Sequence, residues 1–221
     1  MKPEFWLQRW DENQIGFHLE EVNPSLVEYW QRLAIAPGSR VFVPLCGKSV
    51  DLRWLAEQGH FVEAIELSES AIEQFFNEQG IDYQRHQQGD WLVFESAQIR
   101  IWCGDYFHLT AEQLGSIDAV YDRAALIALP SEWRADYVSQ LINLVGPVPQ
   151  LLVTLDYPQL QMSGPPFSVP NEEVVTLYRD YFETDKILTN KTDVLSEHAH
   201  FAKRGLTSLF ECVYLMQVSK K

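Results

Sequence analysis

The sequence predicts an α/β fold in which a mostly parallel sheet carries helices on both faces. Short apolar runs typical of buried strands alternate with runs of helical spacing along the 221 residues. The first such unit has a strand at 40–45, a helix that starts at Ser49 and ends at Gly59, and a second strand at 60–67. Strands that are joined in this way by single helices are typical of a parallel sheet.

The domain organisation predicted for the chain is simple. It shows no internal repeat, low-complexity tract or linker, and its length suits one domain with a single sizeable core. We therefore expect one domain over residues 1–221. Within it, residues 1–36 would form an N-terminal helical arm and residues 37–221 the α/β core.

Polar caps and glycines mark where the first helices begin and end. Asn23 can cap a helix that begins with Pro24, where the missing N–H does no harm. Ser70 and Glu73 form a capping-box pair for a helix that runs to Gly80. These signals predict one helix before the first strand and one after the second.

The second half of the chain continues the alternation. Apolar runs at 91–94 and 99–102 flank a short polar turn, which predicts a hairpin whose second arm enters the main sheet. Further on we expect strands at 117–121, 151–155 and 206–218, a helix capped by Ser131 that ends at Gly146, a helix at 171–181, and a proline-rich loop at 157–170.

The net charge of −14 bounds the partners of the chain. Nucleic acid and anionic membranes need a basic face, so neither is an expected partner. The N-terminus has no apolar signal core, and no later apolar run approaches the length of a membrane span. We therefore expect a soluble, cytoplasmic protein, and the net charge does not by itself select a substrate.

The thiols and imidazoles show no spacing typical of a metal site. Cys46, Cys103 and Cys212 are far apart and lie in apolar, strand-like segments, which favours buried, reduced thiols. The six histidines show no H-E-x-x-H spacing, so no metal is expected. The chain also lacks a G-x-S-x-G elbow, which weakens a hydrolase interpretation.

The spacing of Gly47 and Glu66 is the main functional signal. Glu66 ends the second strand and lies about 20 positions after Gly47, as the ribose-binding acid does in nucleotide-binding βαβ units. The turn at Gly47 lacks the G-x-G-x-x-G pattern that cradles phosphates. This combination points to an adenosyl ligand without phosphates, for which S-adenosylmethionine (SAM) is the obvious candidate. The alternatives are a surface acid at Glu66 and an ordinary helix-entry glycine at Gly47.

Polar residues that follow other strands are further candidates, because ligands bind beyond the carboxyl ends of parallel strands. Asp105 could accept from an adenine amino group while Tyr106 covers the ring, although a capping role for this aspartate is nearly as plausible. Arg123 would lie at the rim of the sheet, where a guanidinium needs an anion. That anion is either part of a ligand or the neighbouring Asp122.

The N-terminal arm is rich in aromatic residues. Trp6 and Trp10 are four positions apart and share one face of a predicted helix, and Phe17 follows. One interpretation is that the arm simply packs on the body. The other is a lid whose aromatic faces meet a sulfonium cation and the ring of an acceptor. The spacing alone does not decide between them.

Several motifs together resemble the thiopurine S-methyltransferase family, particularly its bacterial members. The string Pro44-Leu-Cys-Gly-Lys48 is specific, and the order and spacing of the other strings add independent weight. The matching segments are residues 6–10, 16–18, 40–48, 59–60, 66–68, 121–126, 164–167, 205–206 and 209–211.

The resemblance implies a Rossmann-like class I SAM-dependent methyltransferase fold, a seven-stranded sheet whose last strand is antiparallel. Carried over by position, the implied SAM contacts are Trp10, Leu45, Glu66 and Arg123. Trp6 would help to close the site, and Gly47, Asp105 and Tyr106 would line the cofactor. The residues implied to border the acceptor are Phe17, Arg123 and Pro166.

The chain departs from the family pattern near the acceptor. Family members commonly place an arginine in the segment before Gly205, whereas an ungapped alignment puts His200 there. Lys203 or Arg204 could substitute if the register shifts. The group that pairs with an anionic acceptor is therefore left open, and His200 is taken as the acceptor-side candidate.

The resemblance implies methyl transfer from SAM to sulfur, with S-adenosylhomocysteine (SAH) as the second product. The expected acceptor is a thiopurine or another aromatic or heterocyclic thiol, with selenium or tellurium species as further acceptors. A monomeric enzyme with a role in detoxification is expected, in which Arg123 positions the acceptor and no general base is assigned. The alternatives are a SAM-binding sensor without turnover and, less favoured, a nicotinamide-dependent oxidoreductase.

Overall fold

The computed structural model describes residues 3–16, 18–183 and 188–217. The chain forms two compact units, residues 1–121 and 122–221, and each is described by itself. The candidate Phe17 lies outside the described residues. The prediction of a single domain over residues 1–221 stays a prediction.

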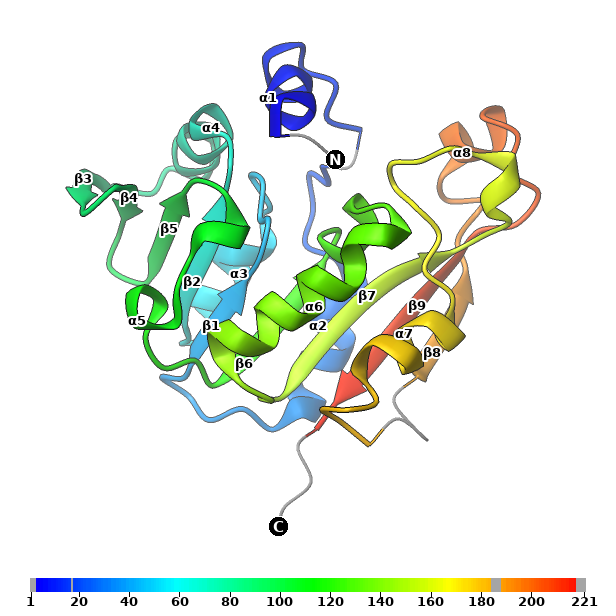
Figure 1. The fold of residues 1–221 in the computed structure, drawn as a ribbon. Helices are drawn as coiled ribbons and strands as arrows, with labels where there is room; N and C mark the ends of the chain where they lie inside the picture. The colour runs from blue at the N-terminus through cyan, green and yellow to red at the C-terminus, as the bar shows by residue number, and fades with distance from the viewer. Residues whose placement is uncertain (1–2, 17, 184–187, 218–221) are drawn as a thin grey trace. The chain divides into compact units, whose positions relative to one another are not determined.

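The first unit contains a mixed, mostly parallel arrangement of strands. Their order is β3-β4-β5-β2-β1-β6, which can be followed in Figure 1. Strand β1 pairs in parallel with β2 and β6, and β5 is parallel to β2, whereas β3 and β4 are antiparallel neighbours. The bounds are β1 (Arg40–Val43), β2 (Phe61–Glu66), β3 (Gln84–Gln88), β4 (Trp91–Glu95), β5 (Ile99–Cys103) and β6 (Ala119–Arg123), whose last two residues begin the second unit.

Helices of the first unit pack against these strands. Both α3 and α4 contact β2 and β5, and α1 contacts α4. The core beneath them contains the fully buried Leu52, Phe75, Phe94 and Trp102. The bounds are α1 (Pro3–Asp11), α2 (Pro24–Tyr29), η1 (Trp30–Leu33), α3 (Asp51–Glu57), α4 (Glu69–Gln79), η2 (Tyr106–His108) and α5 (Ala111–Leu114).

The capping predictions are confirmed in one case and wrong in another. Asn23 caps α2, its side-chain oxygen accepting from Ser25 N at 2.9 Å. The helix predicted to open at Ser70 and Glu73 opens earlier, because the Ser68 hydroxyl accepts from Ala71 N at 3.2 Å. That earlier cap lets α4 begin at Glu69, three residues after β2 ends.

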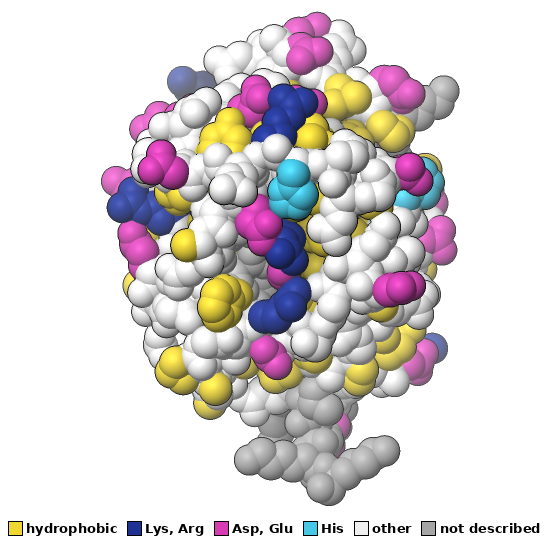
Figure 2. Space-filling model, turned by 90° about the vertical axis from the view of Figure 1, so that its left-hand side faces the viewer, with side chains coloured by type: hydrophobic (Ala, Val, Ile, Leu, Met, Phe, Trp, Pro, Cys, Tyr) yellow, Lys and Arg dark blue, Asp and Glu magenta, His cyan; other side chains and the backbone are white. Residues whose placement is uncertain are grey.

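A row of charged side chains crosses the strands of the first unit. Glu63 on β2 lies 2.8 Å from Arg40 on β1 and 3.5 Å from Arg100 on β5. Arg100 also pairs with Glu95 on β4, which lies 4.0 Å from His86 on β3. Figure 2 shows basic, acidic and histidine side chains close together down the middle of the face that it views. Such cross-strand pairs favour the register in which opposite charges meet.

The second unit contains an antiparallel set of strands in the order β7-β9-β8. The predicted final strand at 206–218 is shorter than expected, since β9 begins only at Phe210 and residues 206–209 are not part of a helix or strand. Ser131 is the first residue of α6 rather than its cap. The bounds are β7 (Gln150–Asp156), β8 (Leu188–Asp193), β9 (Phe210–Met216), η3 (Leu126–Ala128), α6 (Ser131–Val145), η4 (Gln159–Gln161), α7 (Asn171–Tyr178) and α8 (Ala199–Lys203).

The α/β class with a mostly parallel sheet is confirmed, and so is the antiparallel direction of the last strand, because β9 runs antiparallel to β7. The predicted number of seven strands is wrong, since the described residues form nine. Strand β3 (QRHQQ) gave no signal because its side chains are polar and mostly exposed. Strand β8 (LTNKTD) is similarly polar.

Among the described residues, no helix combines the length and apolar character needed to cross a membrane. In the same part of the chain, no three His, Cys, Asp or Glu side chains are grouped as metal ligands would be.

We expect Gly104→Ala to destabilise the fold. Gly104 has φ 154°, and an added Cβ would lie 2.6 Å from Cζ3 of the buried Trp91. Strain and overpacking together should lower the free energy of unfolding by about 2–3 kcal/mol in urea titrations. Gly89→Ala is the matched control, because Gly89 also has a positive φ but open space around its Cβ position. Equal effects of the two changes would contradict the predicted clash.

Candidate active site

The carboxylate of Glu66 joins the turns that follow two parallel strands. Gly47 N, after β1, donates to Oε2 at 2.9 Å, and Ser68 N, after β2, donates to Oε1 at 2.8 Å. Glu66 is buried, with 7% of its surface exposed. A carboxylate offers about four lone-pair sites, so the two oxygens keep the capacity to accept further hydrogen bonds. That is the capacity which a ribose diol requires.

The turn after β1 has the backbone conformation needed for a close approach. Leu45 and Gly47 both have positive φ, 46° and 55°, and Cys46 N donates to Ile65 O at 3.0 Å. A Cβ on Gly47 would lie 3.2 Å from Cζ2 of Trp10. The glycine therefore allows the indole of Trp10 to lie directly on the turn.

Burial raises the pKa values of two side chains at this turn, the Glu66 carboxyl and the Cys46 thiol. Burial raises the pKa of Glu66 above 4.5, and the N–H groups of Ser68, Gly47 and Leu67 act in the opposite direction. Burial, together with the charge of Glu66, raises the pKa of the Cys46 thiol well above 9.0. Cys46 is thus a neutral packing residue of the turn, which agrees with the reduced, buried thiols expected from the sequence.

Asp105 and Tyr106 follow β5, the strand beside β2. In the register of these strands Glu66 is opposite Cys103, so Asp105 lies just beyond the same edge. Its Oδ1 accepts from Phe107 N at 3.0 Å and caps η2, so the capping alternative is confirmed. Tyr106 is buried. A contact of either residue with adenine stays a prediction.

The arm places Trp10 against the body and leaves space beside it. Trp10 is buried, whereas Trp6 is only partly buried and meets Phe5 edge to face at 5.3 Å. A hollow of about 510 Å³ lies between the arm and the turn after β1, and it is lined by Asn13, Ile15, His18, Glu20, Lys48, Val50, Glu78 and Gln79. The packing role predicted for the arm is confirmed at Trp10, and the lid stays a prediction.

In the second unit, Arg123 ends β6 and is partly exposed. The neighbouring Asp122 is fully buried, and it accepts from Tyr137 Oη at 2.7 Å and from Leu126 N at 3.3 Å. Within the described residues no ion pair joins Arg123 to Asp122. The structural alternative for Arg123 is therefore not supported, and a ligand anion stays its predicted partner.

The loop that contains Pro166 is fixed by long-range hydrogen bonds. Tyr157 Oη donates to Pro166 O at 2.6 Å, and Phe167 N donates to Ile127 O at 2.7 Å. A Cβ on Gly164, which has φ 74°, would clash with the Phe167 ring, so a glycine is favoured there. The sequence did not single out Tyr157, because its partner lies nine residues away in an irregular loop.

His200 lies on α8, which packs on the same part of the second unit. Its ring centroid is 4.0 Å from that of Phe201, and Phe201 shares an apolar cluster with Tyr157. Burial and the nearby His198 and Arg204 lower the pKa of His200 from 6.5. Lys203 and Arg204 are exposed at the end of the same helix, so all three acceptor-side candidates lie on one turn and the choice among them stays open.

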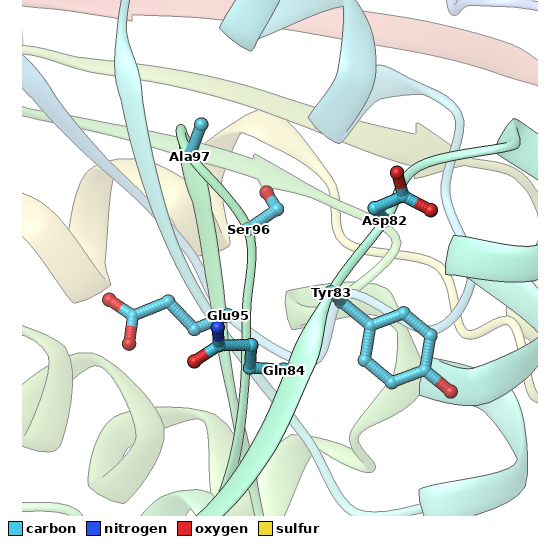
Figure 3. Close-up of a pocket in the computed structure, with 6 residues that line it drawn as sticks. All are labelled: Asp82, Tyr83, Gln84, Glu95, Ser96 and Ala97. Carbon is cyan, nitrogen blue, oxygen red and sulfur yellow. The ribbon is translucent and has the colours of Figure 1, made fainter.

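Another hollow, of about 550 Å³, lies away from the turns that hold Glu66. Figure 3 shows its lining residues around the start of β3 and the turn between β4 and β5. None of them is a predicted site residue, and Glu95 is already paired with Arg100. We assign no function to this hollow.

Comparison with known sequences identifies close relatives. The family model described as thiopurine S-methyltransferase matches residues 1–219. A thiopurine S-methyltransferase of Pseudomonas fluorescens is 48% identical over 214 residues, which cover 97% of this chain and 98% of the relative. One from Pseudomonas putida is 47% identical over 221 residues and covers all of both chains.

Solved structures support the fold at much lower identity. The 1,6-didemethyltoxoflavin-N1-methyltransferase of Burkholderia thailandensis, with bound SAH, has a TM-score of 0.63 and 14% identity over 97% of this chain and 87% of its own. The magnesium protoporphyrin IX methyltransferase of Synechocystis, also with SAH, has a TM-score of 0.62 and 15% identity over 96% and 99% of the two chains. These similarities show the fold alone.

We expect Asp122→Asn to change how stability depends on pH. Burial raises the pKa of Asp122 from 3.8 to about 6, although the hydroxyl of Tyr137 opposes this shift. The raised pKa means that the stability contributed by this group is present below about pH 4 and is lost as pH rises through about 6. An asparagine does not ionise. As pH rises from about 4 to about 6, the free energy of unfolding of Asp122→Asn should therefore increase by up to about 3 kcal/mol relative to that of wild type.

Urea titrations at about pH 4 and about pH 6 measure this difference in the free energy of unfolding between Asp122→Asn and wild type. Asp136→Asn, which changes an exposed carboxylate on α6, is the control and should follow wild type. Parallel stability curves for Asp122→Asn and wild type would contradict the raised pKa.

Proposed function

The chain belongs to the thiopurine S-methyltransferase family and is a SAM-dependent methyltransferase, and we propose that its methyl acceptor is the sulfur of a small aromatic or heterocyclic thiol. The products would be the methyl thioether and SAH. Selenium or tellurium nucleophiles would react in the same way. The acceptor part of the proposal rests on the relatives described as thiopurine S-methyltransferases. The single structural observation that supports the cofactor part is the Glu66 carboxylate, which is held by Gly47 N and Ser68 N.

The residues of the first unit fit an adenosyl cofactor without phosphates. The free lone pairs of Glu66 suit the two hydroxyls of a ribose, and charge-assisted hydrogen bonds of this kind are strong. Leu45 and Gly47 allow backbone to approach the ligand closely. Asp105 and Tyr106, beyond the adjacent strand, would bind the adenine.

The arm would retain the cofactor and shield the reaction from water. Trp10 lies on Gly47, and Trp6 is one helical turn away on the same helix. The faces of indole rings attract cations, which suits a sulfonium. Phe17, in the same arm, and Pro166 would border the acceptor, and His200 would be its acceptor-side polar neighbour.

SAM supplies a methyl group that its sulfonium charge activates. The acceptor reacts as a thiolate, the more nucleophilic form of a thiol. A lone pair of the thiolate forms the new carbon–sulfur bond while the bond from methyl to sulfonium breaks and its electrons stay on the departing sulfur. Because aromatic thiols are acidic and lose their proton to water, no general base is assigned. Arg123 would hold the anionic acceptor by its charge.

Burial disfavours the thiolate form of the protein's own cysteines. Burial raises the pKa of Cys103 and of Cys212 to about 11, and that of Cys46 well above its usual value. All three are therefore neutral and poor nucleophiles at physiological pH.

The expectations of a monomer, a cytoplasmic location and a role in detoxification rest on the sequence and the resemblance, and they belong to this proposal.

A labelled-methyl transfer assay tests the acceptor. Aromatic thiols and selenols are compared with the matching phenols and anilines, and SAH formation is the readout. We expect methylation of sulfur and selenium and none of oxygen or nitrogen. Methylation of oxygen or nitrogen alone would contradict the proposal. SAH binding without any product would instead indicate a SAM-binding module.

Two variants test the residues that carry the reaction. Glu66→Ala should weaken SAH binding by about a hundredfold, because two charge-assisted hydrogen bonds are lost. Arg123→Ala should lower kcat/KM for anionic thiols by about ten- to a hundredfold. Arg53→Ala, which removes an exposed arginine paired with Glu57 on α3, is the control and should leave both unchanged. Unchanged binding and turnover in both site variants would contradict these assignments.

A further inference from the structure

The packing of the chain changes sharply at Asn23. After it, Leu26, Trp30 and Leu33 are buried, and Trp30 Nε1 donates to His60 Nε2 at 3.0 Å. Before it, Trp10 is the only buried side chain among the described residues 3–16 and 18–22. We call Asn23 the root of the arm, because the described residues before it are mostly exposed and several side chains after it are buried.

The carboxylate of Asp51 holds this root. Its Oδ1 accepts from Asn23 N at 2.8 Å, and its Oδ2 accepts from Tyr121 Oη at 2.8 Å. Only 1% of Asp51 is exposed. The side chain of Asn23 is engaged separately in capping α2, so the chain direction is fixed on both sides of the root.

Asp51 also ends the turn that contains Gly47. It is the first residue of α3, and its N–H donates to Ser49 Oγ at 3.3 Å. One carboxylate thus connects the root of the arm with the end of the turn on which the arm lays Trp10. Tyr121, its other partner, is on β6, two residues before Arg123.

A carboxylate is a costly choice for this buried position. Among the described residues it forms no ion pair, and a buried charge without a counter-charge is unfavourable. The helix start at α3 offsets part of this cost. An apolar side chain would fill the space but would leave Asn23 N–H unpaired. The directional bonds to Asn23 and Tyr121 are therefore the property that distinguishes Asp51 from an apolar residue.

The arm meets the body at both of its ends. At one end Trp10 is buried, with its Cζ2 3.2 Å from the position of a Cβ on Gly47, and α1 contacts α4. At the other end Asp51 holds Asn23. The hollow of about 510 Å³, whose lining includes Asn13, Ile15, His18 and Glu20, lies beside the arm. Because the arm is attached at both ends, a change at Asn23 affects how firmly Trp10 is held against Gly47.

We propose that Asp51 is a positioning residue for SAM binding. By fixing Asn23 to the end of the turn, it holds Trp10 against Gly47 and so strengthens the binding of the cofactor. Asp51 acts through the arm and not by contact with the cofactor. The inference rests on the proposed function, because it assigns the cofactor to the turn that holds Glu66.

Calorimetry of SAH binding to the full chain tests this role. Asp51→Ala should weaken binding about tenfold or more, a magnitude typical of coupled sites. Asp51→Asn can still accept from Asn23 N and can donate to the oxygen of Tyr121, so it should restore most of the affinity. Tyr121→Phe should cause a smaller loss. Tyr178→Phe removes another buried tyrosine hydroxyl, which accepts from Gln150 Nε2 at 3.3 Å, and should leave SAH affinity unchanged.

A double-mutant cycle with Trp10→Ala separates positioning from a general loss of stability. If Asp51 acts through the arm, Asp51→Ala should weaken binding much less in the Trp10→Ala background than in wild type. If Asp51→Ala does not fold, the same cycle with Tyr121→Phe decides. Wild-type affinity in the Asp51 and Tyr121 variants, or additive effects in the cycle, would contradict the positioning role of Asp51 and leave the proposed function intact. Absence of SAH binding by wild type would overturn the proposed function as well.

Discussion

The structure of the candidate site depends on one buried carboxylate. Glu66 accepts hydrogen bonds from the turns after β1 and β2, through Gly47 N at 2.9 Å and Ser68 N at 2.8 Å. Without it, two buried N–H groups would lose their acceptor, at a cost of about 1–3 kcal/mol each. Its burial raises its pKa, so the protein holds a carboxylate that is poorly solvated and gains from further donors. The same group that shapes the two turns is the one that we propose binds a ribose.

The position of the N-terminal arm in the first unit depends on this arrangement. The turn that Glu66 fixes places Gly47 where Trp10 can lie on it, and the end of that turn, at Asp51, holds the root of the arm at Asn23. In the second unit a comparable role falls to Tyr157, whose hydroxyl fixes Pro166. Neither Asp51 nor Tyr157 was predicted to contact a ligand. Each nevertheless holds a segment that contains a predicted contact, the arm with Trp10 or the loop with Pro166.

The sequence predicted the parts of this account that depend on local pattern. The spacing of Gly47 and Glu66 was sufficient to bring these two residues together, and the apolar runs were sufficient to predict β1, β2 and β7. It misplaced the start of α4 because Ser68 and Ser70 are both plausible caps, and it missed β3 because a polar edge strand has no apolar alternation. Asp51 was missed because an aspartate at a helix start is common, and its partner Tyr121 lies 70 residues away.

Calorimetry of SAH binding from neutral to acidic pH, with wild type and Glu66→Gln, tests the central role of this carboxylate most directly. Ribose hydroxyls donate to the ionised form, so affinity should be full above the raised pKa of Glu66 and should fall as pH drops through it. Glu66→Gln should bind more weakly at the higher pH and show no such fall, which accounts for other titrating groups. Equal affinities of the two proteins, or the same pH dependence in both, would contradict the account.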